Sequence, residues 1–265
     1  MKDIQNNHDD RRIPIKKAGI KHLRYPIVVL DRKNKSQHTV ADLNMYVDLP
    51  HNFKGTHMSR FVEIINSFQG KVSVHKLDHL LKEMIQKFDS EIAHLEIKFP
   101  YFLEKTAPVS GSVSQMKYDC ALTAALDATK KDGNKGIDLI MEVAVPVTTL
   151  CPCSKEISDK GAHNQRSVVT IKCRTNALVW LEELIEVAES EASSPIYPLL
   201  KREDEKKVTE MAYDNPRFAE DIVRGIAVKL KKDSRITWFE VETENFESIH
   251  DHNAYAQVVS GFAEE

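Results

Sequence analysis

Residues 137–147 read IDLIMEVAVPV, and this segment decides the fold. Every second side chain from Ile137 to Val147 is apolar, which is the period of a β-strand with one buried face. A polar stretch follows from Thr148 to about Gln165, and the alternation returns at residues 169–173. The pattern therefore predicts two long strands joined by a loop.

The rest of the second half is predicted to form helices and then strands. Apolar residues at helical spacing cover 178–188 and 218–230, and a charged helix covers about 202–212. Asn215 and Pro216 are expected to open the helix that follows them, because Asn caps helices and Pro suits the first helical position. Strands are expected at about 235–242 and 253–260.

The first half has the same order of elements. Alternation predicts strands at 43–49, 93–99 and 112–127, helical spacing predicts helices at 61–68 and 77–88, and a turn is expected at 132–134. Helices grouped between strand pairs favour an α+β fold over a doubly wound parallel sheet. We expect a polar arm over residues 1–30, then a first unit over about 31–130 and a second over about 131–265.

Composition excludes several classes of protein. The chain has 265 residues, of which 42% are hydrophobic and 29% charged, so it is long enough to bury a large core. The 37 basic and 40 acidic residues give a net charge of −3, so no global basic excess points to nucleic acid. No apolar run approaches the length of about 20 residues that a membrane span needs, and no secretory signal is evident. We expect a cytoplasmic protein whose four cysteines are free thiols or metal ligands.

The loop after residue 147 concentrates reactive side chains. Cys151, Lys155, His163 and Arg166 fall within it, with Cys153 two residues after the first cysteine. Thiolate and imidazole are good zinc ligands, and a catalytic metal needs about three protein ligands and one open position. A single Cys-x-Cys with one downstream His is equally consistent with incidental polar residues, so both readings stay open.

Three further stretches contain candidate groups. Residues 201–221 carry Glu205 and Glu220, although charged helical runs are more often solvated faces. Residues 247–253 carry two histidines that share one face in an extended segment, or else form a surface turn. Residues 54–60 precede a helix and either bind an anion or simply cap that helix. Walker A, GxGxxG and GxSxG motifs are absent, so P-loop, Rossmann and serine-hydrolase readings lack their signatures.

Taken together, five motifs resemble one family. They are KGTHMSRF at 54–61, VPVTTLCPCSKEIS at 145–158, GAHNQ at 161–165, KREDE at 201–205 and ESIHDHNAYA at 247–256. In this order they resemble the prokaryotic type IB GTP cyclohydrolases, and the resemblance runs from about residue 40 to the C-terminus.

The resemblance implies an activity and an architecture. It implies conversion of GTP and water to 7,8-dihydroneopterin triphosphate and formate, the first step toward folate and other pterins. It also implies tandem tunnelling-fold units, in which antiparallel sheets carry paired helices on one face. The subunits are expected to form a homotetramer with active sites at interfaces, and no nucleic acid or membrane partner is expected.

The resemblance also assigns residue roles. One divalent ion per active site, zinc, manganese or iron, is expected on Cys151, His163 and Glu205. Beside it, Cys151, Glu220, His250 and His252 are expected to act in catalysis. Substrate contacts are expected from Glu247, which would anchor the guanine edge, and from Lys54, His57, Arg60, Lys155 and Arg166, which would contact the triphosphate or the ring.

Two other readings remain open at this stage. A related tunnelling-fold enzyme, the NADPH-dependent nitrile reductase of queuosine synthesis, adds its cysteine to a nitrile and needs no metal. A non-catalytic metal-stabilised scaffold would instead fill all four metal positions with protein groups and unfold on chelation.

Overall fold

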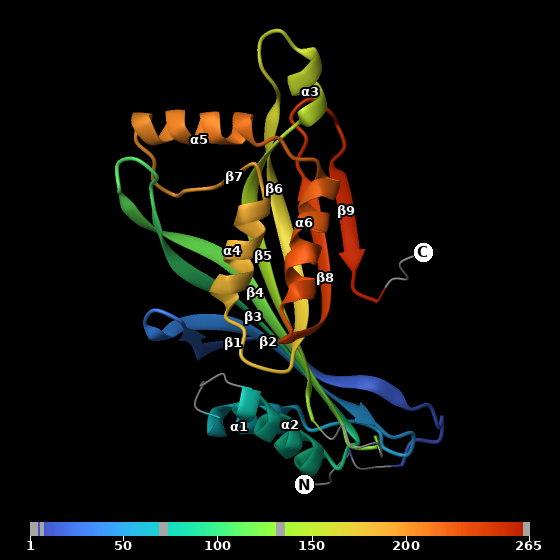
Figure 1. The fold of residues 1–265 in the computed structure, drawn as a ribbon. Helices are drawn as coiled ribbons and strands as arrows, with labels where there is room; N and C mark the ends of the chain where they lie inside the picture. The colour runs from blue at the N-terminus through green and yellow to red at the C-terminus, as the bar shows by residue number, and fades with distance from the viewer. Residues whose placement is uncertain (1–4, 6–7, 69–73, 131–135, 262–265) are drawn as a thin grey trace. The chain divides into compact units, whose positions relative to one another are not determined.

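The computed structural model describes residues 5, 8–68, 74–130 and 136–261 (Figure 1). The described residues contain six helices and nine strands. They form two compact units: unit 1 consists of Met1–Pro100 and Ala121–Ile140, and unit 2 consists of Tyr101–Cys120 and Met141–Glu265. The turn predicted at 132–134 lies outside the described residues.

Strands in both units are antiparallel. The strand order is β1-β2-β3-β4-β5-β6-β8-β9, with β7 beside β5. The strands are β1 (Ile15–Asp31), β2 (Lys35–Leu49), β3 (Ile92–Thr106), β4 (Val113–Asp127), β5 (Asp138–Leu150), β6 (Asn164–Thr175), β7 (Ser194–Pro195), β8 (Ile236–Asn245) and β9 (Ala254–Val259). The α+β class and the antiparallel sheet agree with the prediction. The units are not separated by one cut in the chain, because β3, β4 and β5 each contribute residues to both.

Unit 1 packs two helices against its strands. Helices α1 (Met58–Ser67) and α2 (Val74–Phe88) contact each other, and α1 contacts β1 while α2 contacts β2. The rings of Phe61 and Phe88 stack with centroids 4.2 Å apart. Alternate residues of β2, such as Met45 and Val47, are fully buried beneath them.

The N-terminal part of unit 1 differs from the prediction. Residues 15–30, expected in a polar arm, lie in β1, which pairs with β2 in the register Leu23 opposite Leu43. The physical reason is an alternation of apolar side chains, in which Ile27 and Val29 are buried, among many lysines and arginines. The lysines and arginines of β1 occupy exposed positions of the strand.

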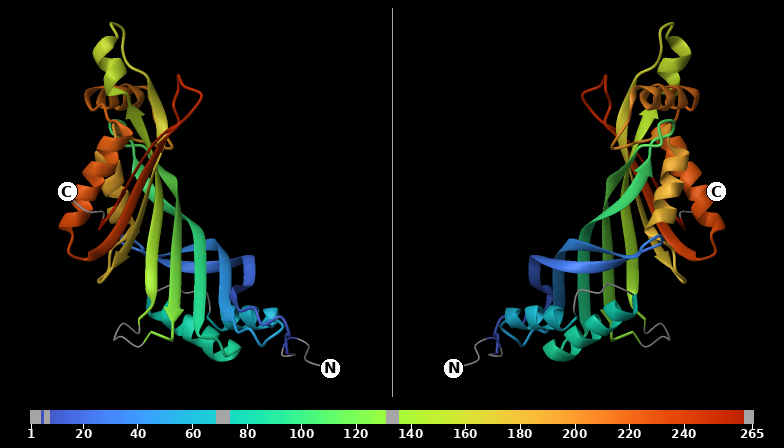
Figure 2. Two further views of the ribbon diagram at one scale, coloured as in Figure 1. Left: turned by 90° about the vertical axis from the view of Figure 1, so that its right-hand side faces the viewer. Right: turned by 90° about the vertical axis from the view of Figure 1, so that its left-hand side faces the viewer.

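Unit 2 carries a second pair of helices. Helices α4 (Leu181–Glu191) and α6 (Ala219–Lys232) pack side by side on one face of its strands (Figures 1 and 2). Their buried residues Leu184 and Ile222 belong to a core that includes Val169 of β6 and Val241 of β8. Burial of such apolar side chains, at ~1.5–3 kcal/mol each, is the main force holding the helices to the sheet.

Two more helices complete unit 2, and one boundary differs from the prediction. Helix α3 (Pro152–Ile157) lies in the expected loop, and α5 (Arg202–Asp214) is the expected charged helix. The next helix does not open at Asn215: this residue ends α5, and its side chain donates to the carbonyl of Ala192 at 2.8 Å. Helix α6 begins at Ala219 after Phe218, so the predicted cap was wrong.

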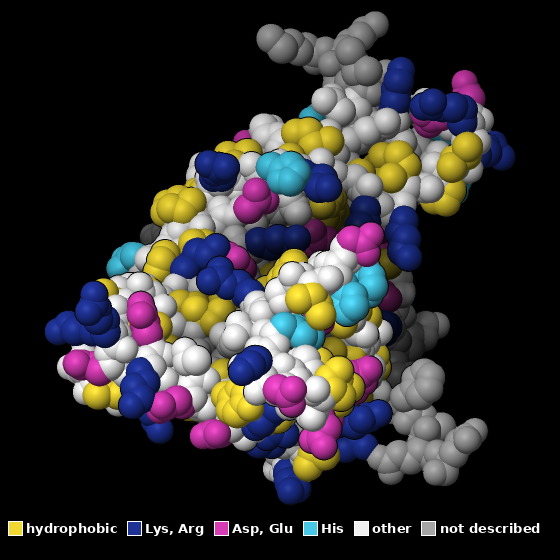
Figure 3. Space-filling view, turned by 90° about the horizontal axis from the view of Figure 1, so that it is seen from above, with side chains coloured by type: hydrophobic (Ala, Val, Ile, Leu, Met, Phe, Trp, Pro, Cys, Tyr) yellow, Lys and Arg dark blue, Asp and Glu magenta, His cyan; other side chains and the backbone are white. Residues whose placement is uncertain are grey.

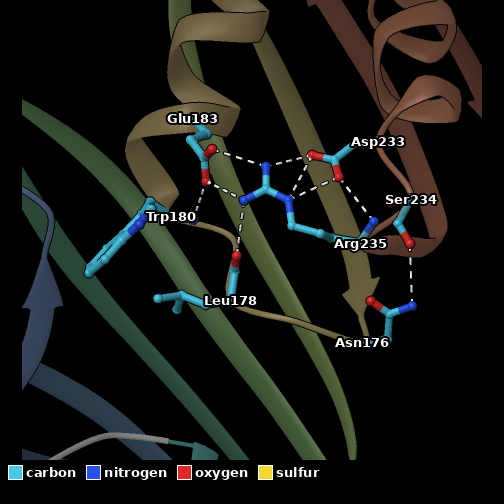
Figure 4. A network of polar contacts seen from close by, with 7 residues as sticks. All are labelled: Asn176, Leu178, Trp180, Glu183, Asp233, Ser234 and Arg235. Atoms are coloured by element: carbon cyan, nitrogen blue, oxygen red, sulfur yellow. Dashed lines mark hydrogen bonds and ion pairs between the residues drawn. The ribbon is translucent and has the colours of Figure 1, made fainter.

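A polar cluster fixes the start of α4 to the turn between α6 and β8 (Figure 4). The guanidinium of Arg235 contacts Glu183 at 3.0 Å and Asp233 at 2.6 Å, and it donates to the carbonyl of Leu178 at 3.0 Å. These contacts hold the pKa of the Asp233 carboxyl below its usual value. None of the helices in the described part of the chain has the length and hydrophobicity required to cross a membrane.

Candidate active site

The loop between β5 and β6 brings Cys151 and His163 together. The backbone N–H of Cys151 donates to the carbonyl of His163 at 3.1 Å. Ser154 bridges the same two residues: its hydroxyl accepts from the His163 N–H and donates to the Cys151 carbonyl, both at 3.2 Å. The Cys151 sulfur accepts the Ser154 N–H at 3.4 Å, which orients it at the start of α3. Cys151 is partly buried, whereas Cys153 is exposed.

A hydrogen-bond chain orients the imidazole of His163. Its Nδ1 lies 3.0 Å from Oε1 of Gln165 and 3.9 Å from Oε2 of Glu247. Gln165 donates its Nε2 to Thr149 Oγ1 at 2.8 Å, and Thr149 Oγ1 lies 2.8 Å from the hydroxyl of Ser167. Because Gln165 Oε1 only accepts, Nδ1 carries the proton in this contact, and the lone pair on Nε2 is left for a ligand.

Helix α5 positions Glu205 through its neighbour Asp204. The buried Asp204 carboxylate accepts from the backbone N–H groups of Val109, Ser110 and Lys201, each at 2.9 Å, and from the Ser110 hydroxyl at 2.6 Å. Burial alone raises the pKa of Asp204, but these hydrogen bonds outweigh it and hold the pKa below its usual range. Asp204 thereby fixes the first turn of α5 to the turn between β3 and β4.

The third predicted ligand is near this turn but does not complete a metal cluster within the chain. Glu205 is exposed, and it precedes Val208 by three residues, so the two share a helix face. Val208 lines a cavity together with Gln165. Among the described residues, no group of three or more His, Cys, Asp or Glu side chains is close enough to hold a metal ion. The structure thus brings together two of the three predicted ligands, Cys151 and His163, through a backbone hydrogen bond.

The predicted acid–base groups lie on the surface of unit 2. The rings of His250 and His252 stack with centroids 5.1 Å apart, but they lie in a bend of exposed residues, which is the surface-turn alternative and not the extended segment. Glu220 is exposed in the first turn of α6. The Glu247 side chain is mostly buried, and the preceding residue Phe246 donates its N–H to the carbonyl of Arg166 at 3.0 Å. This bond draws the segment after β8 toward β6.

The two predicted cations of unit 2 have different surroundings. The Lys155 ammonium donates to the backbone carbonyl of Tyr213 and lies 4.3 Å from the centroid of the Tyr213 ring. Lys155 therefore already has partners within the chain. Arg166 is exposed and lines a cavity of about 370 Å³. The other lining residues are Thr148, Asn164, Gln165, Pro195, Ile196, Tyr197, Leu200 and Val208.

The remaining predicted contacts, Lys54, His57 and Arg60, belong to unit 1. His57 and Arg60 line a cavity of about 290 Å³ at the start of α1, together with Lys87 and Asp89. Arg60 donates to the carbonyl of Lys87 at 3.0 Å, which fixes its side chain at the cavity. Arg60 and Lys87 give this cavity two cations against the one carboxylate of Asp89, and the net positive charge suits an anionic ligand.

Sequence reasoning missed two residues that organise this site. Gln165 follows His163 by two residues, and the period of two in a strand was the available signal that they share a face. Asp204 stands three residues after Lys201, the spacing of a helix-capping acid.

Lys, Arg, Asp, Glu and His side chains are interspersed on the surface seen from above (Figure 3).

Solved structures define the fold of the chain. The uricase of Arthrobacter globiformis has a TM-score of 0.52 at 11% identity, covering 94% of this chain and 95% of its own. The urate oxidase of Bacillus subtilis 168 has a TM-score of 0.53 at 8% identity, covering 93% and 98%. The chain therefore has the fold of the urate oxidases.

Sequence relationships define the family. The family model described as type I GTP cyclohydrolase folE2 matches residues 1–256. The GTP cyclohydrolases FolE2 of Syntrophotalea carbinolica and Geobacter sulfurreducens are each 55% identical over 258 residues, covering 97% of this chain and 94% and 97% of those proteins. The chain belongs to the type I GTP cyclohydrolase folE2 family, which confirms the resemblance found in its motifs.

Proposed function

We propose that the protein converts GTP and water to 7,8-dihydroneopterin triphosphate and formate, as the first step of folate and pterin biosynthesis. Its 55% identity to GTP cyclohydrolases over nearly the whole chain carries the proposal. The local geometry supports it, because the family motifs meet at Cys151 and His163.

Cys151, His163 and Glu205 are the proposed ligands of one divalent ion, zinc, manganese or iron. Thiolate, imidazole and carboxylate together suit such an ion, and the Nδ1 contact with Gln165 leaves His163 Nε2 available. When bound, the ion supplies a water of lowered pKa, which is a nucleophile at neutral pH. Glu205 shares a helix face with Val208, which lines the cavity beside Gln165.

The other residues bind the base and move protons. Opening of the imidazole ring requires protons at the ring nitrogens, and His250, with His252 beside it, is proposed to deliver them. Glu220 is the proposed second acid–base group for formate release, ribose opening and the Amadori rearrangement. Glu247 is proposed to accept from guanine N1–H and the 2-amino group, which selects against adenine because adenine lacks both donors.

Triphosphate or ring contacts are proposed from Lys54, His57, Arg60, Lys155 and Arg166. The cavity lined by His57 and Arg60 supports this role for those two residues of unit 1. Lys155 would have to leave the Tyr213 carbonyl to reach a phosphate.

A cytoplasmic homotetramer of tandem tunnelling-fold units, with active sites at interfaces, is proposed as the working form. Two observations support it. Each unit places a helix pair against antiparallel strands. Glu205, Glu220 and His250 are exposed in the single chain, as expected of groups that complete a site with a second subunit.

The test is formate release from GTP by chelator-stripped protein with and without added Mn²⁺ or Zn²⁺. We expect product only with metal, loss of product in Cys151→Ala with the fold retained, and retained product in the matched control Cys153→Ala. Failure of every metal to restore product in folded protein would contradict the proposal. Metal-independent NADPH oxidation with a nitrile would indicate the nitrile reductase, and unfolding on chelation would indicate the scaffold.

A further inference from the structure

The cavity lined by Arg166 has two chemically different sides. Asn164, Gln165 and Arg166 of β6 line it with polar groups, and Ile196 and Tyr197 line it with apolar surface. Its volume of about 370 Å³ falls within the range of ~300–1,000 Å³ typical of small-molecule sites. A mixed lining of this kind suits a flat heterocycle with polar edges.

The cavity adjoins the proposed metal ligands. Gln165 lines it and contacts His163 Nδ1 at 3.0 Å, and His163 lies 3.9 Å from Glu247. A ring bound here therefore lies next to His163, a proposed metal ligand, and to Glu247, which is proposed to accept from the guanine edge. The lining contains one cation, Arg166, which is too little positive charge for a triphosphate.

A pair of opposite charges lies beside the Tyr197 ring. The Lys105 ammonium pairs with the Glu189 carboxylate and lies 5.1 Å from the centroid of the Tyr197 ring. The Tyr118 hydroxyl donates to the same carboxylate at 2.9 Å. Only 11% of the Lys105 side chain and 16% of the Glu189 side chain are exposed. Such a desolvated pair contributes little stability by itself, so a role in fixing geometry accounts better for it.

We propose that this cavity binds the purine ring of the nucleotide, that Tyr197 forms the wall against the ring face, and that the Lys105–Glu189 pair positions Tyr197. The inference rests on the proposed function and assigns it a ring subsite. Aromatic side chains stack on nucleobases because every base presents a flat π-face.

The test compares Tyr197→Ala with Tyr197→Phe and with Tyr25→Ala, a half-buried tyrosine of unit 1 that lines neither cavity described above. Inhibition of formate release is measured with guanosine, which carries only the ring and ribose, and with inorganic triphosphate. Tyr197→Ala is expected to raise the KM for GTP and the Ki for guanosine about tenfold, with the triphosphate Ki unchanged. Tyr197→Phe and Tyr25→Ala are expected to behave as the parent protein.

An unchanged guanosine Ki in a folded Tyr197→Ala variant, or a rise in the triphosphate Ki instead, would overturn the assignment. These outcomes are separate from a failure of the proposed function, in which the parent protein itself releases no formate from GTP.

The positioning pair is tested with the double variant Lys105→Met/Glu189→Gln, which removes both charges and keeps similar side-chain shapes. We expect a KM for GTP raised about threefold or more with kcat retained, because the wall is loosened and the reacting groups are untouched. Lys105→Arg keeps a cation near Tyr197 and is expected to retain the parent KM. A parent-like KM in the folded double variant refutes the positioning role.

Discussion

Replacing Lys105 by methionine removes the cation from a mostly buried pair and leaves the Glu189 carboxylate without its partner. Both side chains are less than one-fifth exposed, so the remaining charge is poorly solvated. Breaking such a pair from one side costs ~3–5 kcal/mol of unfolding free energy. The Tyr118 hydroxyl still donates to the carboxylate, which places the expected loss near the lower end, at about 3 kcal/mol.

The assay is urea unfolding followed by circular dichroism, at one protein concentration because assembly affects apparent stability. The matched control is Lys117→Met, whose pair with Asp119 spans 2.9 Å but has side chains 55% and 68% exposed. We expect ~0–1 kcal/mol for that variant, and a near-neutral effect for Lys105→Met/Glu189→Gln. Equal effects of Lys105→Met and Lys117→Met would refute the reasoning from burial.

Three further predictions follow from the described residues. Burial raises the pKa of the Cys173 thiol to about 12 and that of Cys120 further, so a thiol reagent at pH 8 should label Cys153 readily and these two only after unfolding. Hydrogen bonds hold the pKa of Asp204 below its ordinary value of 3.8. The carboxylate therefore stabilises the native state above about pH 4, and this stabilisation is lost as the pH falls. In Asp204→Asn, the free energy of unfolding should depend less on pH below about pH 4. Gly19→Ala should destabilise unit 1 by ~1–3 kcal/mol in urea unfolding, because the added Cβ would lie 1.9 Å from a backbone oxygen of β2.

Much of the fold was predictable because apolar and polar residues alternate clearly along most of its strands. β5 and β6 followed directly from a period of two, and α2 followed from its helical spacing. Helix α3 could not be predicted, because six residues are too few to show a period. β1 was missed because lysines and arginines between its apolar residues resembled a solvated arm.

For the site, the sequence predicted the types of residue but not the contacts among them. The motifs supplied Cys151 and His163, but their backbone hydrogen bond and the Ser154 bridge that reinforces it have no signature in the sequence. Asp204 binds the backbone of Ser110, 94 residues earlier in the chain, and such long-range partners leave no local pattern. The ion pair beside Tyr197 joins three distant segments of the chain, so it also could not be predicted from the sequence.

The most direct test of the account is the fate of carbon 8 in GTP labelled there with ¹³C, supplied with Mn²⁺ to the full-length protein. The account predicts labelled formate in a one-to-one ratio with unlabelled 7,8-dihydroneopterin triphosphate. Label retained in intact GTP, under conditions where the protein is folded and metal-loaded, would contradict the central claim.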